Sequence, residues 1–229
     1  MESLVVGARA PRAAKAERAR SSSVGQKALI AASGVFLWGW CCLHLLGNLT
    51  VFSGAEVMDR YGSLLRRGGS VPLWGLRIAL LVAFVGHVWL VVGAWRRARQ
   101  ARPIPYAVVR YRAARWTSRS LRVGGIIIGL FVVFHLLHLT LGALHPSFEP
   151  GKAYGNLVRG FDSGLVVGVY VVASLALGSH LSHGLLAAPS SLGWLLPARA
   201  GRALALVLGV GLAAGFACVP LAIWLGVLK

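Results

Sequence analysis

The segment Phe131-Val-Val-Phe-His135-Leu-Leu-His138-Leu-Thr140 decides how the whole chain is interpreted. It lies inside an apolar run from about 121 to 143, and it contains two histidines three residues apart. A run of about 20 apolar residues is long enough to cross a bilayer as a helix. Ionisable side chains inside such a span are costly and mark functional sites by default. The two histidines therefore direct attention to histidines in other apolar runs.

The composition extends this interpretation to the rest of the chain. Of 229 residues, 57% are hydrophobic and only 13% are charged, whereas soluble domains average about 25% charged residues. Five apolar runs are long enough to span, and a lipid-exposed backbone must satisfy its hydrogen bonds internally, which favours helices. These runs cover about 28–52, 72–95, 121–143, 163–187 and 203–227. We expect an all-α integral membrane protein with five transmembrane helices, four forming a core and the fifth lying at its periphery.

The basic residues predict the orientation of the helices. The net charge of +18 raises the possibility of nucleic-acid binding, but the lysines and arginines lie in segments flanking apolar runs, so we expect no nucleic-acid partner. The first 27 residues lack the short apolar segment of a signal peptide, and we expect a basic cytoplasmic arm over 1–27 and a membrane domain over 28–227. Of 24 lysines and arginines, 17 fall on the side of the N-terminus and 7 on the other. The positive-inside rule therefore predicts a cytoplasmic N-terminus and an external C-terminus.

Four histidines occupy matching depths in the first four runs. His44 and His135 lie in the outer halves of runs that both lead outward, and His87 and His180 lie near the inner ends of runs that both lead inward. At a rise of 1.5 Å per residue, the second pair is about 10 Å closer to the cytoplasm. The intervals agree as well, since 91 residues separate the first pair and 93 the second.

Paired imidazoles at two depths suit two haems. A six-coordinate haem takes one axial ligand from each of two helices, and imidazole binds its iron well. A single intramembrane histidine is often only a hydrogen-bonded packing residue, but four paired by depth are harder to explain in that way. Zinc draws its ligands into one compact tetrahedral group. Cys41-Cys42-Leu43-His44 lacks the spacing for covalent haem attachment, so two non-covalent b haems are expected.

An ordered set of motifs resembles a known family. Its pieces are His44-Leu-Leu-Gly-Asn48, His87-Val-Trp89, Arg122 thirteen residues before His135, and His180-Leu-Ser-His183-Gly-Leu185. From about residue 22 to 227, the chain resembles the cytochrome b membrane-anchor subunit of succinate:quinone oxidoreductase, in the type with five helices and two b haems. Related fumarate reductases share this subunit.

The resemblance implies particular ligands and partners. His44 and His135 would bind the outer haem iron, and His87 and His180 the inner one. Arg122 and Arg119 would pair with haem propionates, although positive-inside charge alone also explains them. A flavoprotein and an iron–sulfur subunit would dock on the cytoplasmic face of a bacterial inner membrane, and electrons would reach a quinone, with menaquinone expected. The chain contains no flavin or iron–sulfur motif, so succinate chemistry belongs to the partners.

The quinone site is predicted only by proximity. Asn48, Glu56, Asp59 and Tyr61 follow His44 within a few turns and offer hydrogen-bonding groups, but solvated loop residues would look the same. His138 and His183 each follow a predicted ligand by three residues. We expect them near a propionate or the quinone, or in simple helix packing.

Two other functions remain open from the sequence. The chain could be the di-haem cytochrome b of a hydrogenase or formate dehydrogenase, which would have a different soluble partner. It could also be a haem-free transporter or assembly scaffold. The lack of carboxylates in the central parts of the first four runs argues against ion transport.

Overall fold

The computed structural model describes residues 23–67, 70–101, 114–194 and 197–229. Its five long helices are α2 (Ser23–Leu49), α4 (Ser70–Gln100), α5 (Ala114–His135), α7 (Gly164–Ser191) and α8 (Ala198–Trp224). All five contain a segment long and apolar enough to cross a membrane. The prediction of an all-α, multi-pass membrane protein with five spanning helices is confirmed.

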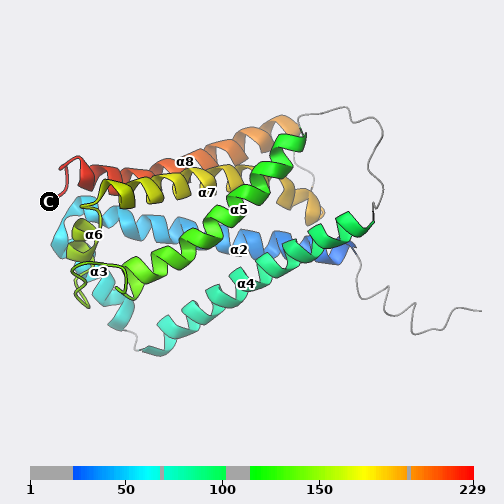
Figure 1. Ribbon diagram of the computed structural model, residues 1–229. Coiled ribbons are helices and arrows are strands. Elements are labelled where there is room, and N and C mark those ends of the chain that lie inside the picture. Colours follow the sequence, from blue (N-terminus) through cyan, green and yellow to red (C-terminus); the bar gives the residue numbers. More distant parts are fainter. Residues whose placement is uncertain (1–22, 68–69, 102–113, 195–196) are drawn as a thin grey trace, which may run out of the picture.

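Helix α7 lies at the centre of the bundle and packs against α8, α5 and α2 (Figure 1). The closest approach joins α7 and α8. A Cβ atom on Gly178 would lie 2.7 Å from the Gly209 carbonyl oxygen and 2.6 Å from the Ala213 side chain. Small residues permit such close helix crossings in membranes. Helix α8 also contacts α2, and 33% of its most apolar segment is buried, against none of that of α4. The expectation of a peripheral fifth helix is therefore wrong, because α8 packs into the bundle and α4 is the outlying span.

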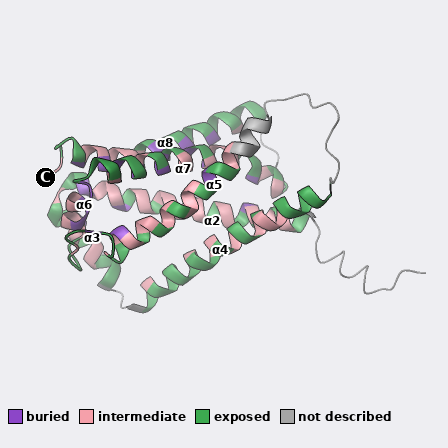
Figure 2. Cartoon of the chain, in the orientation of Figure 1, coloured by how far each residue is buried: buried purple, intermediate pink, exposed green. Residues whose placement is uncertain are grey.

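Helix α4 follows α2 and diverges from it toward one end of the bundle (Figure 1). Gln26 of α2 donates a hydrogen bond of 2.8 Å to the Leu90 carbonyl and also bonds to Arg97, so the two helices are joined near the end of α4. None of the most apolar segment of α4 is buried, and Trp89 is 75% exposed (Figure 2). In a bilayer this apolar surface is available to lipid or to a cofactor.

Short helices cover one end of the bundle, at connections that the sequence analysis treated as loops. They are α3 (Ala55–Arg67), which follows the 3₁₀ turn η1 (Thr50–Ser53), and α6 (Ala153–Gly160), which follows the π-helical turn η2 (Leu136–Thr140). We call this end, where the C-terminus also lies, the capped end. The opposite end, with exposed Arg96, Arg97, Arg99, Arg199 and Arg202, is the basic end.

The largest group of buried side chains lies toward the capped end. It joins residues from η1, α3, α6, α7 and α8: Val51, Met58, Leu157, Phe161, Val167, Tyr170, Val219 and Ile223. Phe131, Phe134 and Leu139, from α5 and η2, pack against this group. This buried cluster at the capped end adjoins the histidines of the opening segment, because Phe131 and Phe134 closely precede His135 on α5.

Candidate functional site

His44 of α2 and His135 at the end of α5 meet inside the bundle. Their ring centroids are 5.8 Å apart and their planes cross at 82°. Trp40 stacks on His44 at 5.6 Å, and Phe131 lies 5.7 Å from His135. The structure therefore brings together the two histidines that depth alone had paired, and it surrounds them with aromatic rings.

The separation of these two imidazoles fits ligation of one metal between them. With each ligating nitrogen about 2 Å from a shared metal, two imidazole centroids would be roughly 6 Å apart. The observed spacing is 5.8 Å. Helices α2 and α5 each pack against α7 and are not closely packed against each other. His44 and His135 therefore meet across the space between α2 and α5.

The second ring nitrogen of His135 has its own hydrogen-bond partner. Its Nδ1 lies 3.3 Å from the Tyr170 hydroxyl of α7, slightly longer than the usual range for such bonds. Metal-binding histidines almost always hold their other nitrogen in a hydrogen bond of this kind, which orients the ring. The arrangement leaves Nε2 of His135 as the nitrogen available to a metal.

His138 lies in a different environment although it is only three residues away. It is 1% exposed, its Nδ1 lies 3.0 Å from the Tyr170 hydroxyl, and its ring stacks against Phe134 at 5.4 Å. A Cβ atom on Gly160 would lie 3.3 Å from Nε2 of His138. Because Nε2 faces the α6 backbone so closely, His138 has no room for a metal on that side.

His145, which the sequence analysis did not single out, completes this packing. Its ring stacks on His138 at 5.3 Å. Nδ1 accepts a hydrogen bond of 3.0 Å from the Ser147 backbone N–H, and Nε2 donates one of 2.8 Å to the Asn156 carbonyl. An N–H can only donate and a carbonyl can only accept, so these bonds specify the neutral Nε2–H form. His145 is thus a structural link between the segment after η2 and α6.

His87 of α4 is oriented by α2. Its Nδ1 lies 2.9 Å from the Ser33 hydroxyl, which also lies 2.8 Å from the Leu29 carbonyl of the preceding turn. With the hydroxyl proton directed to that carbonyl, the Ser33 oxygen accepts the Nδ1–H of His87, and Nε2 carries no proton. The ring packs over Gly34, where a Cβ atom would lie 3.2 Å from the imidazole.

His180 of α7 has a buried nitrogen without a partner. Among the described residues, its Nδ1 and the Trp38 Nε1 are the buried side-chain polar atoms that lack a hydrogen bond. Leaving such a group unsatisfied costs about 1–3 kcal/mol, and native proteins rarely do so. Trp38 lies on α2 between Ser33 and His44. Both atoms are therefore suited to a polar group that the chain itself does not supply.

The second predicted pair is more open than the first. His183 lies one helical turn after His180 on α7. Within the described part of the chain, no ring contact joins His87 to His180 as one joins His44 to His135. Their helices, α4 and α7, are not closely packed, which leaves the space between them to other groups.

The predicted propionate partners lie at the basic end. The guanidinium of Arg122 is exposed and lies 5.9 Å from the centre of the Trp95 ring, linking α5 to α4. Arg99 lies over the same ring at 5.0 Å. The backbone of Arg119 belongs to α5, but its side chain is outside the described part of the structure.

The predicted quinone residues gather at the capped end with different roles. Asn48 is partly buried at the end of α2, and Glu56 is exposed on α3. Asp59 accepts a hydrogen bond of 2.9 Å from the Tyr154 backbone N–H in the first turn of α6. The Tyr61 ring packs so closely on Gly47 that an added Cβ would be 2.7 Å away. Asp59 and Tyr61 thus make contacts that hold the capped end together.

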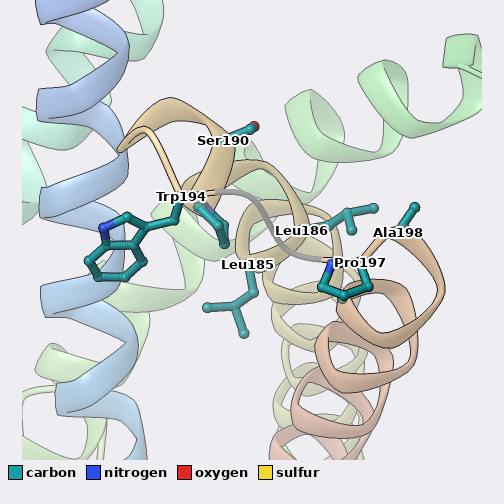
Figure 3. Close-up of a pocket in the computed structure, with 8 residues that line it drawn as sticks. Leu185, Leu186, Ser190, Trp194, Pro197 and Ala198 are labelled. Atoms are coloured by element: carbon teal, nitrogen blue, oxygen red, sulfur yellow. The ribbon is translucent and has the colours of Figure 1, made fainter.

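Within the described ranges, no three histidine, cysteine or acidic side chains gather in a group suited to a metal ion. A shallow apolar hollow lies at the basic end, between the end of α7 and the start of α8 (Figure 3). Its lining consists of Leu185, Leu186, Pro189, Ser190, Trp194, Pro197, Ala198 and Gly201. The lining contains no histidine or charged side chain, so the hollow is separate from the histidine pairs.

No protein-family model, curated protein or solved structure matches the chain. The four histidines of the ordered motifs lie on α2, α4, α5 and α7, and the structure brings His44 and His135 together.

Proposed function

We propose that this chain is the di-haem cytochrome b membrane-anchor subunit of a succinate:quinone oxidoreductase, either a succinate dehydrogenase or a fumarate reductase. The observation that carries the proposal is the meeting of His44 and His135 at 5.8 Å, from helices that are not neighbours in the chain. Imidazole binds haem iron well, and two imidazoles from different helices at this separation would be able to hold one haem between them.

The hydrogen bonds of the other nitrogens support the same assignment. Ser33 holds Nδ1 of His87 and Tyr170 holds Nδ1 of His135, so both rings keep Nε2 for a metal. His180 has a buried unpaired nitrogen facing α5, where Gly125 leaves room beside its ring. We assign His44 and His135 to one haem and His87 and His180 to the other.

Bound b haem supplies one-electron transfer, at a potential set by its ligands and surroundings. The residues of this chain orient the ligands, and the bundle excludes water from them. The basic end would face the cytoplasm, where exposed Arg96, Arg97 and Arg99 suit docking of the iron–sulfur and flavoprotein subunits. The capped end would face outward in a bacterial inner membrane, with menaquinone as the electron acceptor or donor there.

The test is haem content in matched histidine variants of the complex purified from its native membrane. We expect two b haems per chain, loss of one in His135→Ala, and retention of both in His138→Asn, because His138 is enclosed by α6 and asparagine keeps a hydrogen-bond acceptor there. His87→Ala should remove the other haem. A pyridine haemochrome assay gives the stoichiometry, and co-purifying flavin and iron–sulfur subunits identify the enzyme. Hydrogenase or formate dehydrogenase partners would contradict the enzyme assignment, and a haem-free protein would contradict the whole proposal.

A further inference from the structure

The hydroxyl group of Tyr170 lies within hydrogen-bond distance of two histidines in the capped end. The Tyr170 hydroxyl lies 3.3 Å from Nδ1 of His135 and 3.0 Å from Nδ1 of His138. The phenol ring is held by edge contacts with Phe131 at 4.9 Å and Phe161 at 4.7 Å, and it is 7% exposed. These ring contacts therefore fix the position of the Tyr170 hydroxyl oxygen beside the two histidines.

The backbone after α5 is wound so that both imidazoles reach this hydroxyl. The Leu141 N–H bonds to the Leu136 carbonyl at 2.8 Å, a five-residue step that widens the turn. Single π-helical turns of this kind within helices occur frequently at functional sites. Here the turn η2 carries His138, and His135 immediately precedes it.

The single proton of the hydroxyl couples the two histidines. A neutral imidazole has one N–H and one bare nitrogen, while a hydroxyl can donate once and accept as well. If Tyr170 donates to His138, it can accept the Nδ1–H of His135, and Nε2 of His135 is bare. If Tyr170 donates to His135 instead, Nε2 of His135 carries the proton and cannot bind a metal. Of these two arrangements, only the first is compatible with ligation. If Tyr170 accepted from both imidazoles, its own buried hydroxyl proton would have neither ring as an acceptor.

We propose that Tyr170 and His138 are positioning residues for His135: Tyr170 accepts its Nδ1–H, and His138 accepts the Tyr170 proton. This inference rests on the proposed function, because it presents Nε2 of His135 to a haem iron. It also gives His138 a role. The sequence analysis expected this residue either near a propionate or the quinone, or in simple helix packing. Donation from Nδ1–H to such a partner makes the ligand more basic, which favours the oxidised metal.

The test is Tyr170→Phe, which removes the hydroxyl and keeps the ring contacts. We expect the midpoint potential of the His44–His135 haem to rise while that of the other haem is unchanged, and haem retention to fall about tenfold or more. Tyr154→Phe is the matched control, because the Tyr154 hydroxyl donates to the Lys229 carbonyl and contacts no histidine. His138→Asn, which keeps an acceptor, should preserve the potential better than His138→Leu.

A second readout does not depend on haem. In the haem-free protein, the ¹⁵N signals of the Nδ1 atoms of His135 and His138 should both move in Tyr170→Phe, and neither should move in Tyr154→Phe. Unchanged ¹⁵N signals, or unchanged potentials in a protein with two haems, would overturn the inference while the proposed function stands. A wild-type protein without haem would instead overturn the proposed function, and the ¹⁵N shifts would still test the hydrogen bonds.

Discussion

Replacing Ser33 with alanine isolates the hydrogen bond that orients His87. The Ser33 hydroxyl lies 2.9 Å from Nδ1 of His87, within the normal hydrogen-bond range, whereas Tyr170 lies 3.3 Å from His135. Removing a hydrogen-bond partner of a metal-binding histidine typically weakens metal binding about 10–100-fold, which corresponds to about 1.4–2.8 kcal/mol. The shorter bond places Ser33→Ala toward the upper part of that range, above Tyr170→Phe.

The assay is titration of haem into the haem-free chain in detergent, followed by optical redox titration of the loaded protein. Ser33→Ala should weaken binding at the His87–His180 site and raise the potential of that haem alone. Ser174→Ala is the control, because the Ser174 hydroxyl bonds to the Tyr170 carbonyl within its own helix and contacts no histidine. Equal haem affinity and equal potentials in Ser33→Ala and the wild type would refute the assigned role of Ser33.

Two further predictions concern the capped end. Gly160→Ala places a methyl group 3.1 Å from both His138 and His145, so we expect a loss of about 1–3 kcal/mol in stability, measured by thermal unfolding. Gly168→Ala, with open space around its Cβ, should be neutral or stabilising by comparison. Asp59→Ala, which removes the acceptor of the Tyr154 N–H, should weaken the start of α6 by about 0.5–2 kcal/mol, while exposed Glu56→Gln should not alter stability. Quinone turnover unchanged in both acidic variants would exclude them from the quinone site.

The fold could be predicted because membrane spans have a simple signature. Length and hydropathy identified five spans. Helices α2, α4, α7 and α8 begin and end within five residues of the predicted runs, whereas α5 begins at Ala114 and ends at His135, before the π-helical turn η2. Helices α3 and α6 escaped prediction because they are short and carry charged and polar residues on one face, which a hydropathy scale scores as loop. Of the basic arm predicted over 1–27, residues 1–22 lie outside the described residues, and residues 23–27 belong to helix α2, so the predicted boundary was wrong by five residues. The side chain of Arg119 also lies outside the described residues.

The site could be predicted only as far as depth along a helix determines it. The depths of His44 and His135 follow from the rise per residue, and the structure brings these two rings into contact. Depth could not find Ser33 or Tyr170, because their role depends on how α2 turns toward α4 and α7 toward α5. Close contacts such as Gly178 of α7 against Gly209 of α8 constrain how these helices face their neighbours, and hydropathy carries no information about them.

Sequence alone likewise could not decide whether His135 or His138 is the candidate ligand. The two residues differ by only about 4.5 Å in depth. The structure distinguishes them through α6, whose Gly160 lies directly against His138 and leaves His135 facing His44. Tyr170, a polar residue inside the apolar run 163–187, was the sequence signal for its hydrogen bonds with His135 and His138. Nothing in the sequence indicated which histidine Tyr170 would contact.

The most direct test of the central proposal is the haem stoichiometry of the wild-type protein. The chain should be purified from its native membrane and its haem extracted as the pyridine haemochrome, with protein measured by amino-acid analysis. The proposal predicts a b-type spectrum and two haems per chain. A spectrum without b haem would contradict it.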